Sequence, residues 1–314
     1  MKLKDNFSTA EVKSFCRRSN FHAWLAVVVT WGIIAFAFAI VALWPNPLTV
    51  VLSLVLLGGR ILGLGVLMHE CGHGTMFKSR SVNNWVGKWL CAGPVFNRID
   101  DYMNNHLKHH AKAGSAEDPD LHRYQNYPVS SAALKRKLFR DMTGRTTINF
   151  LRKAFLANNI IKIDKSGKKR FDLRQFFVRM HAGIISNLVL FGILASLGLP
   201  HLYLLWVAAY FSFYMLFSRI RNLAEHAVVP DIFDADPTLH TRTMLARWWE
   251  RLTFAPNHVN YHLEHHLLPS VPKYRLAAFH EALKQKGMLE HAEIMVGYPT
   301  LIRKLITQPQ PVQA

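Results

Sequence analysis

Long apolar stretches dominate the pattern of hydrophobic and polar positions along the chain, and they come in two closely spaced pairs. Each stretch is long enough to cross a hydrocarbon layer of about 30 Å as a helix. Only Pro45 and Asn46 separate the first pair, and Pro200 separates the second. The pattern predicts four transmembrane helices in two hairpins, over residues 21–44, 47–68, 176–199 and 201–218.

The polar segments that follow each hairpin, residues 69–175 and 219–307, are predicted to form a helical cap on one side of the membrane. The Gln- and Pro-containing tail, residues 308–314, is expected to be disordered. The first span is too long for a cleavable signal peptide, and the second span follows it at once. We therefore expect a single domain, residues 1–314, of the all-α class: a polytopic membrane protein whose cap carries the chemistry.

The distribution of basic residues predicts how the chain is oriented. Five Lys and Arg residues lie in residues 1–20, 17 in residues 97–175 and 11 in residues 219–314, whereas the two hairpin connections carry none. By the positive-inside rule, both termini and the cap face the cytosol. Basic residues beside spans meet anionic headgroups, so membrane lipids account for the formal charge of +18, and no nucleic-acid partner is expected. Three scattered cysteines do not make a disulfide framework.

Two further segments are expected to be helical. Residues 82–96 are too short to span a membrane but contain Trp85, Trp89 and Lys88, which is typical of an interfacial or re-entrant helix. Residues 134–174 are basic and are predicted to be mostly helical with a surface turn at residues 165–168. We assign this second segment no chemistry.

Three five-residue segments concentrate the histidines. They are HECGH at residues 69–73, HLKHH at 106–110 and HLEHH at 262–266, and together they hold eight of the 17 histidines. Residues at i, i+3 and i+4 share one face of a helix, so each segment aims its imidazoles in one direction. Neutral imidazole is the commonest side-chain metal ligand, and buried unpaired rings would be costly. Eight ring nitrogens exceed what one metal needs, so the pattern predicts two metals, each with an open position.

These three segments, in this order and spacing, resemble the histidine boxes of the integral-membrane fatty acid desaturase and hydroxylase superfamily. The resemblance covers almost the whole chain, and residues 260–272 (NYHLEHHLLPSVP) are similar to bacterial acyl-lipid desaturases. It implies a multi-pass protein of a bacterial inner membrane with its active site on the cytosolic side. It also implies that Asn222 and His226, near the end of the fourth span, belong to the metal shell. The ligands implied for two iron ions are His69, His73, His106, His109, His110, His226, His262, His265 and His266, with Asn222 reaching a metal through a water.

The activity implied by the resemblance is the oxidation of an acyl-lipid or fatty acyl chain by dioxygen at the di-iron centre. Removal of two hydrogens gives a cis double bond, whereas oxygen transfer gives an alcohol. Electrons are expected from an external donor, a ferredoxin, rubredoxin or cytochrome with its reductase. Desaturation is the preferred interpretation, and a lipid hydroxylase, ketolase or decarboxylase of the same superfamily is the alternative.

A different class of enzyme remains open at this point, because HECGH also fits the H-E-x-x-H pattern of zinc metallopeptidases, with Glu70 as general base. That interpretation leaves the second and third boxes unexplained. A metal carrier would place its ligands at the middle of the bilayer, which the boxes do not fit. Carboxylates beside the boxes are candidates to orient the imidazoles. They are Glu70, Glu225, Glu264 and Asp118 with Asp120.

Overall fold

The computed structural model describes residues 3–164 and 167–307. Within these residues, four helical segments are long and apolar enough to cross a membrane, as predicted. The first hairpin pairs α2 (Asn20–Leu43) with α3 (Pro47–His73). The second pairs α8 (Leu173–Ser196) with η5 (Pro200–Leu202), α9 (Tyr203–Phe211) and α10 (Phe213–His226). The predicted tail, residues 308–314, lies outside the described residues.

The helix boundaries differ from the sequence prediction in two places that matter for the site. α3 does not stop at residue 68 but continues through the first histidine box, and Gly74 ends it in the left-handed conformation at φ 69°. The fourth span is interrupted at Ser212, which has φ −126° and ψ −91°. The helix resumes as α10, which extends to His226 and so carries that residue out to the level of the boxes.

The central helix of the fold is α3. In its most apolar 18 residues 67% are buried, against 33–39% in the other three spans, because α2, α9 and α10 all pack on it. A Cβ atom at Gly58 would lie 2.5 Å from Cβ of Phe213, and one at Gly59 would lie 2.0 Å from the carbonyl oxygen of Leu252. These two glycines therefore serve close packing, whereas the outer faces of α2, α8 and α9 leave large apolar side chains exposed, as a lipid-facing surface requires.

The segments around the spans are mostly helical, which confirms the all-α class. They include α4 (Arg80–Val86), the π-helix η2 (Gly87–Ala92) and η3 (Gly93–Val95), so the predicted segment 82–96 is helical up to residue 95, while its place at a membrane interface stays a prediction. The remaining helices are η1 (Leu3–Asp5), α1 (Thr9–Phe15), α5 (Ile99–Lys112), η4 (Leu121–Arg123), α6 (Ser131–Met142), α7 (Arg145–Ala157), α11 (Pro237–His240), η6 (Glu250–Leu252), η7 (Pro256–His258), α12 (His262–Leu267), η8 (Lys273–Arg275), α13 (Leu276–Gln285) and α14 (Tyr298–Lys304).

Four short strands were not expected. β1 (Ile161–Ile163) and β2 (Lys169–Phe171) form an antiparallel hairpin, so the predicted helical segment 134–174 is helical only through α7. Its alternation of basic and apolar residues suits a two-stranded ribbon as well as a helix, and periodicity cannot separate the two over so few residues. β3 (Arg242–Leu245) pairs in parallel with β4 (Glu293–Val296), and α12 packs on β3.

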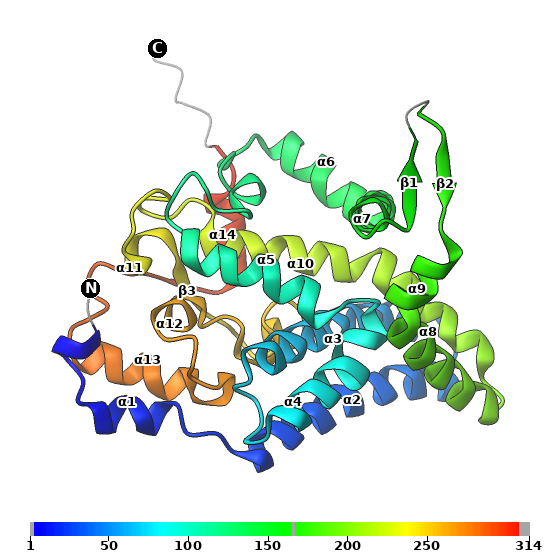
Figure 1. The fold of residues 1–314 in the computed structure, drawn as a ribbon, viewed down its shortest axis with the longest axis horizontal. Helices are drawn as coiled ribbons and strands as arrows, with labels where there is room; N and C mark the ends of the chain where they lie inside the picture. The colour runs from blue at the N-terminus through cyan, green and yellow to red at the C-terminus, as the bar shows by residue number, and fades with distance from the viewer. Residues whose placement is uncertain (1–2, 165–166, 308–314) are drawn as a thin grey trace.

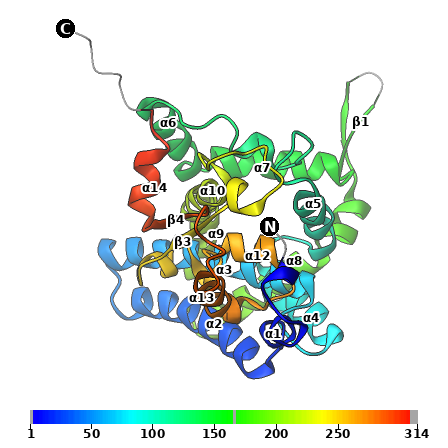
Figure 2. The same ribbon diagram turned by 90° about the vertical axis from the view of Figure 1, so that its left-hand side faces the viewer.

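The histidine-bearing elements meet at one end of the molecule. Figures 1 and 2 show α12, the end of α3, the end of α10 and α5 side by side at the end opposite the tips of the two hairpins. α5 lies across the end of α3, and α12 fills the space between α3, α11 and α13. Segments separated by almost 200 residues along the chain thus reach one small volume.

Candidate metal centre

Each predicted histidine ligand lies on a helix, at or near its end. His69 and His73 occupy the last turn of α3, directly before Gly74. α5 begins with Asp100 and Asp101 and ends with basic residues, an order that suits the helix dipole. Its final two turns present His106, His109 and His110, and α12 presents His262, His265 and His266. His226 is the last residue of α10.

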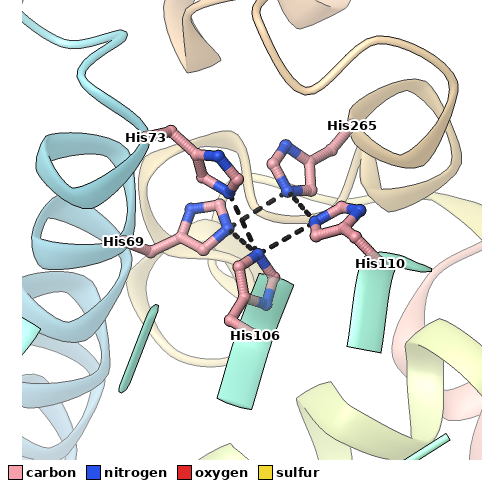
Figure 3. A group of neighbouring side chains, drawn as sticks. All are labelled: His69, His73, His106, His110 and His265. Carbon is pink, nitrogen blue, oxygen red and sulfur yellow. Dashed lines mark hydrogen bonds between the residues drawn. The ribbon is translucent and has the colours of Figure 1, made fainter. Parts of the chain in front are cut away.

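The nine histidines fall into two groups, and within each group all the candidate ligand atoms lie within 4.8 Å of one another. The five-histidine group draws on three helices, and Figure 3 shows its rings turned toward a common centre. The second and third boxes are each divided between the groups. The five-histidine group is His69, His73, His106, His110 and His265, and the four-histidine group is His109, His226, His262 and His266.

The spacing of the Nε2 atoms tests whether the groups fit metal ions. In the five-histidine group, His106 Nε2 lies 2.8 Å from that of His69, 3.0 Å from that of His73 and 2.9 Å from that of His110. In the four-histidine group, the Nε2 atom of His262 lies 2.9 Å and 3.0 Å from its two neighbours. Two ligands at right angles, with bonds of about 2.1 Å, lie about 3.0 Å apart, whereas tetrahedral ligands lie about 3.4 Å apart. These Nε2 separations lie nearer to the right-angled value than to the tetrahedral one.

Carboxylates and a carbonyl hold the opposite nitrogen of several rings. His69 Nδ1 donates to Glu70 Oε1 at 3.1 Å, and Glu70 also accepts the hydroxyl of Thr75 at 2.9 Å. His109 Nδ1 donates to Asp118 at 2.9 Å, and Tyr124 donates to the same carboxylate at 2.5 Å. Because these acceptors have no proton to give, Nδ1 carries the ring proton and Nε2 keeps a lone pair for a metal.

The four-histidine group has one more such hydrogen bond and one ion-pair contact. His226 Nδ1 donates to the carbonyl oxygen of His240 at 2.9 Å. His262 Nδ1 lies 3.3 Å from Oε1 of Glu225, which also pairs with Arg221. Since lone pairs on neighbouring Nε2 atoms repel one another at these distances, both groups fit a cation between the rings.

Two of the predicted orienting carboxylates do not act on a ligand. Glu264 accepts from His280 Nδ1 at 2.6 Å and from the hydroxyl of Thr243, so it braces α12 against α13 and β3 rather than orienting a box histidine. Asp120 contacts Asn105 and Arg123, while its backbone N–H donates to Asp118. Glu70 and Asp118 accept hydrogen bonds from box histidines as expected, whereas Glu225 lies at ion-pair distance from His262 without a hydrogen bond to it.

Burial keeps the imidazoles neutral. Desolvation, reinforced by the neighbouring rings, lowers the pKa of His110 to about 3 and lowers the pKa of His262, His265 and His266 well below the ordinary value. For Asp118, burial acts to raise the pKa, but the hydrogen bonds from His109 and Tyr124 outweigh it and bring the pKa to about 2. At neutral pH these rings are thus neutral, and the group behind His109 is an ionised Asp118 carboxylate.

The contacts of Asn222 point to its role less clearly than those of the histidines do. Its Oδ1 accepts from Arg221 at 3.1 Å, one turn before His226 on α10. Residues that the sequence did not single out also contact the ligands: Tyr124 stacks on His226 at 5.0 Å between ring centroids, and Tyr102 stacks on His106 at 5.4 Å. Tyr102 stands four residues before His106 on the same helix, so its place was readable from the spacing, whereas that of Tyr124 was not.

A cavity of about 20 Å³ borders both groups. It is lined by His69 and His265 of the five-histidine group, by His262 of the four-histidine group, and by Val66 and Arg221 from the preceding turns of α3 and α10. This volume accommodates about one water molecule or one methylene group. It is a position from which a small group could face both histidine groups.

Four apolar helices and two histidine groups at one end define a membrane protein with a candidate metal centre. The sequence pattern of the fatty acid desaturase family matches residues 45–296, which is most of the chain. The chain therefore belongs to the fatty acid desaturase family, and it is an oxidoreductase.

Curated relatives carry desaturase names. The dihydrorhizobitoxine desaturase of Bradyrhizobium elkanii is 28% identical over 255 residues, which cover 78% of this chain and 68% of that protein. The sn-1 oleoyl-lipid 12-desaturase of Synechocystis sp. is 22% identical over 311 residues, covering 91% of this chain and 82% of the relative. The sn-1 acyl-lipid omega-3 desaturase (ferredoxin) of Synechocystis sp. is 30% identical over 99 residues, covering 32% and 26%.

Proposed function

We propose that this desaturase is a di-iron enzyme that introduces a cis double bond into the acyl chain of a lipid, with dioxygen as the oxidant. The observation that carries the proposal is the pair of histidine groups: within each group the candidate ligand atoms all lie within 4.8 Å of one another, and seven pairs of Nε2 atoms lie only 2.8–3.1 Å apart. Names of relatives that act on oleoyl and acyl lipids support an acyl substrate. The proposed ligands are His69, His73, His106, His109, His110, His226, His262, His265 and His266, with Asn222 acting through a water.

Bound iron would supply the reduction of dioxygen with external electrons, which no side chain here can perform. The protein contributes by positioning the imidazoles and the substrate. Glu70 and Asp118 hold the ring protons of His69 and His109 on the outer nitrogens, so that the inner lone pairs of these two rings stay available. Burial of the histidines excludes bulk water, and the cavity beside His69 and His262 offers a methylene group a place next to both groups.

The same proposal includes the surroundings of the enzyme. Both termini and the metal centre would face the cytosol of a bacterial inner membrane, which the basic segments on that side support. α1 packs on α13 at the end of the molecule that carries the centre. Electrons would come from a separate ferredoxin, rubredoxin or cytochrome with its reductase, and the ferredoxin in the name of one relative supports the first of these.

Expression under labelled dioxygen, followed by mass spectrometry of the lipids, tests the reaction. Desaturation consumes one dioxygen, two electrons and two protons per double bond and releases two waters. We expect an acyl product lighter than its precursor by two hydrogens and free of label, with the double bond localised by fragmentation. A product heavier by one labelled oxygen would instead make the enzyme a hydroxylase.

Elemental analysis of the purified protein separates this proposal from the zinc peptidase. We expect two irons per chain after iron-replete expression, whereas one zinc and no iron would contradict the di-iron centre. Lipids that do not change on expression, from a protein with two irons bound, would place the substrate outside the acyl lipids. The relative from Bradyrhizobium elkanii, whose name refers to dihydrorhizobitoxine, would then suggest the next compound to assay.

A further inference from the structure

A tenth histidine lies beside the four-histidine group. His240, the last residue of α11, is 3% exposed, and its ring centroid lies 5.8 Å from that of His266 and 6.2 Å from that of His226. Neighbouring rings inside the group are closer, at 4.5–5.1 Å. His240 is therefore one layer farther out than the ligands themselves, at the distance of a group that acts through an intervening molecule.

The hydrogen bonds of His240 fix which nitrogen carries its proton. Its Nδ1 lies 2.7 Å from the carbonyl oxygen of Asp234, which can only accept, so Nδ1 is protonated and Nε2 has a lone pair. Nε2 is fully buried, and no residue in the described part of the chain bonds to it. A buried acceptor without a partner is costly, which indicates that a donor outside the polypeptide fills this position.

The four-histidine group is the one that would leave a ligand position on its metal for such a donor. It offers one nitrogen fewer than the five-histidine group, although the spacing of its Nε2 atoms indicates the same right-angled arrangement. A water in the remaining position would be a strong hydrogen-bond donor, because a metal ion polarises the water that it binds.

We propose that Nε2 of His240 accepts a hydrogen bond from a water bound to the metal of the four-histidine group. This inference rests on the proposed metal centre. It makes His240 a positioning residue that acts through its side chain, in addition to the main-chain carbonyl that holds His226. Asn222 is the residue expected to contact a metal-bound water, and its Oδ1 already accepts a hydrogen bond from Arg221. Variants of Asn222 and of His240 can therefore be compared as alternative partners of that water.

Two substitutions of His240 separate its two nitrogens. His240→Asn keeps an N–H for the Asp234 carbonyl but has nothing at the place of Nε2, whereas His240→Gln puts an amide at that place. Both keep the main-chain carbonyl that binds His226. His122→Asn is the matched control, because His122 also contacts a backbone carbonyl through Nδ1, that of Pro119 at 2.9 Å, but is exposed and outside the groups.

The readout is the full-length protein loaded with Co²⁺, whose visible bands intensify when a site loses a ligand. We expect two bound metals in every variant, more intense bands in His240→Asn, a spectrum close to wild type in His240→Gln, and no change in His122→Asn. Metal affinity, measured by competition with a chelator, should fall about 10- to 100-fold in His240→Asn, as for other outer partners of metal ligands.

Three results would overturn the inference. One is an unchanged spectrum in His240→Asn while Asn222→Ala alone shows the intensified bands. Another is the loss of a whole metal from both His240 variants, which would make His240 a direct ligand. If His240→Asn does not fold, a His240→Gln spectrum unlike wild type decides against the inference. A wild-type protein that binds no metal would instead remove the proposed function itself.

Discussion

The two histidine groups solve the same problem in different ways. The five-histidine group has the larger number of rings, but within the described residues only His69 among them has a bonded Nδ1, and Nδ1 of His265 is buried without a partner. The four-histidine group has fewer rings, yet Nδ1 of two of them is hydrogen-bonded, to Asp118 and to the carbonyl of His240, and Nδ1 of His262 lies 3.3 Å from Glu225.

This difference indicates two ways of holding an ion: a larger number of rings, or fewer rings whose orientation is fixed by contacts behind them. With five rings on three helices, the loss or tilt of one leaves enough nitrogens to hold an ion. With four, each ring must stay in place, and the contacts behind His109, His226 and His262 help to hold these three there. We therefore expect the four-histidine group to be more sensitive to substitutions in both layers.

The largest effect should come from removing a ring of the four-histidine group. His226→Ala should lose one of the two irons and reduce desaturation by more than about 100-fold, because a ligand matters more than its outer partner. His73→Ala, in the five-histidine group, should keep both irons with weakened affinity. Iron content per chain and product formation in membranes measure the two quantities. Equal iron loss in the two variants would contradict the difference between the groups. Full iron content in His226→Ala would show that His226 is not a ligand.

The next effect concerns the outer layer. Asp118→Ala should lower metal affinity by about 10- to 100-fold, since it frees the ring of His109 and strands the hydroxyl of Tyr124. Asp120→Ala is the control in the same loop, because Asp120 contacts no ring. Chelator competition at pH 7 gives both affinities. If the two variants bind metal equally well, the carboxylate behind His109 does not hold its ring.

A smaller effect should arise from α3, the helix that carries His69 and His73 of the five-histidine group. Gly59→Ala would drive a methyl into the carbonyl of Leu252 and should destabilise the protein by about 1–3 kcal/mol. Gly65→Ala meets nothing within 4 Å and should be neutral or slightly stabilising. Thermal unfolding in detergent compares them. A Gly59 variant as stable as the Gly65 variant would show that η6, which contains Leu252, can shift away from α3 to make space for the methyl group.

Much of this centre could be predicted from the sequence, because box spacing is a property of one helix turn. His69 with His73, and the rings of α5 and α12, share faces for that reason alone. The division of each later box between two groups could not be predicted, since it depends on how α5 and α12 cross. The break at Ser212, the hairpin of β1 and β2, and the pairing of Glu264 with His280 are likewise tertiary effects. His240 lies outside every box, so no spacing signals it.

The smallest expected effect tests how the one bonded Nδ1 of the five-histidine group is secured. Glu70, which holds His69, also accepts the backbone N–H of Lys273 at 3.1 Å, while Nζ of Lys273 is buried without a partner. Burial lowers the pKa of Lys273 from 10.5 to about 7, even though the charge of Glu70 acts to raise it. The unfolded chain therefore binds more protons between these two values, so stability should rise with pH across that window.

Lys273→Met keeps the backbone N–H and removes the charge. It should raise the unfolding temperature by a few degrees at pH 7 and below, with the difference vanishing above pH 10.5, and it should leave metal affinity unchanged. Thermal unfolding across the pH range, with chelator competition alongside, measures both. A loss of metal affinity in Lys273→Met would mean that the ammonium charge, and not the main chain, secures Glu70.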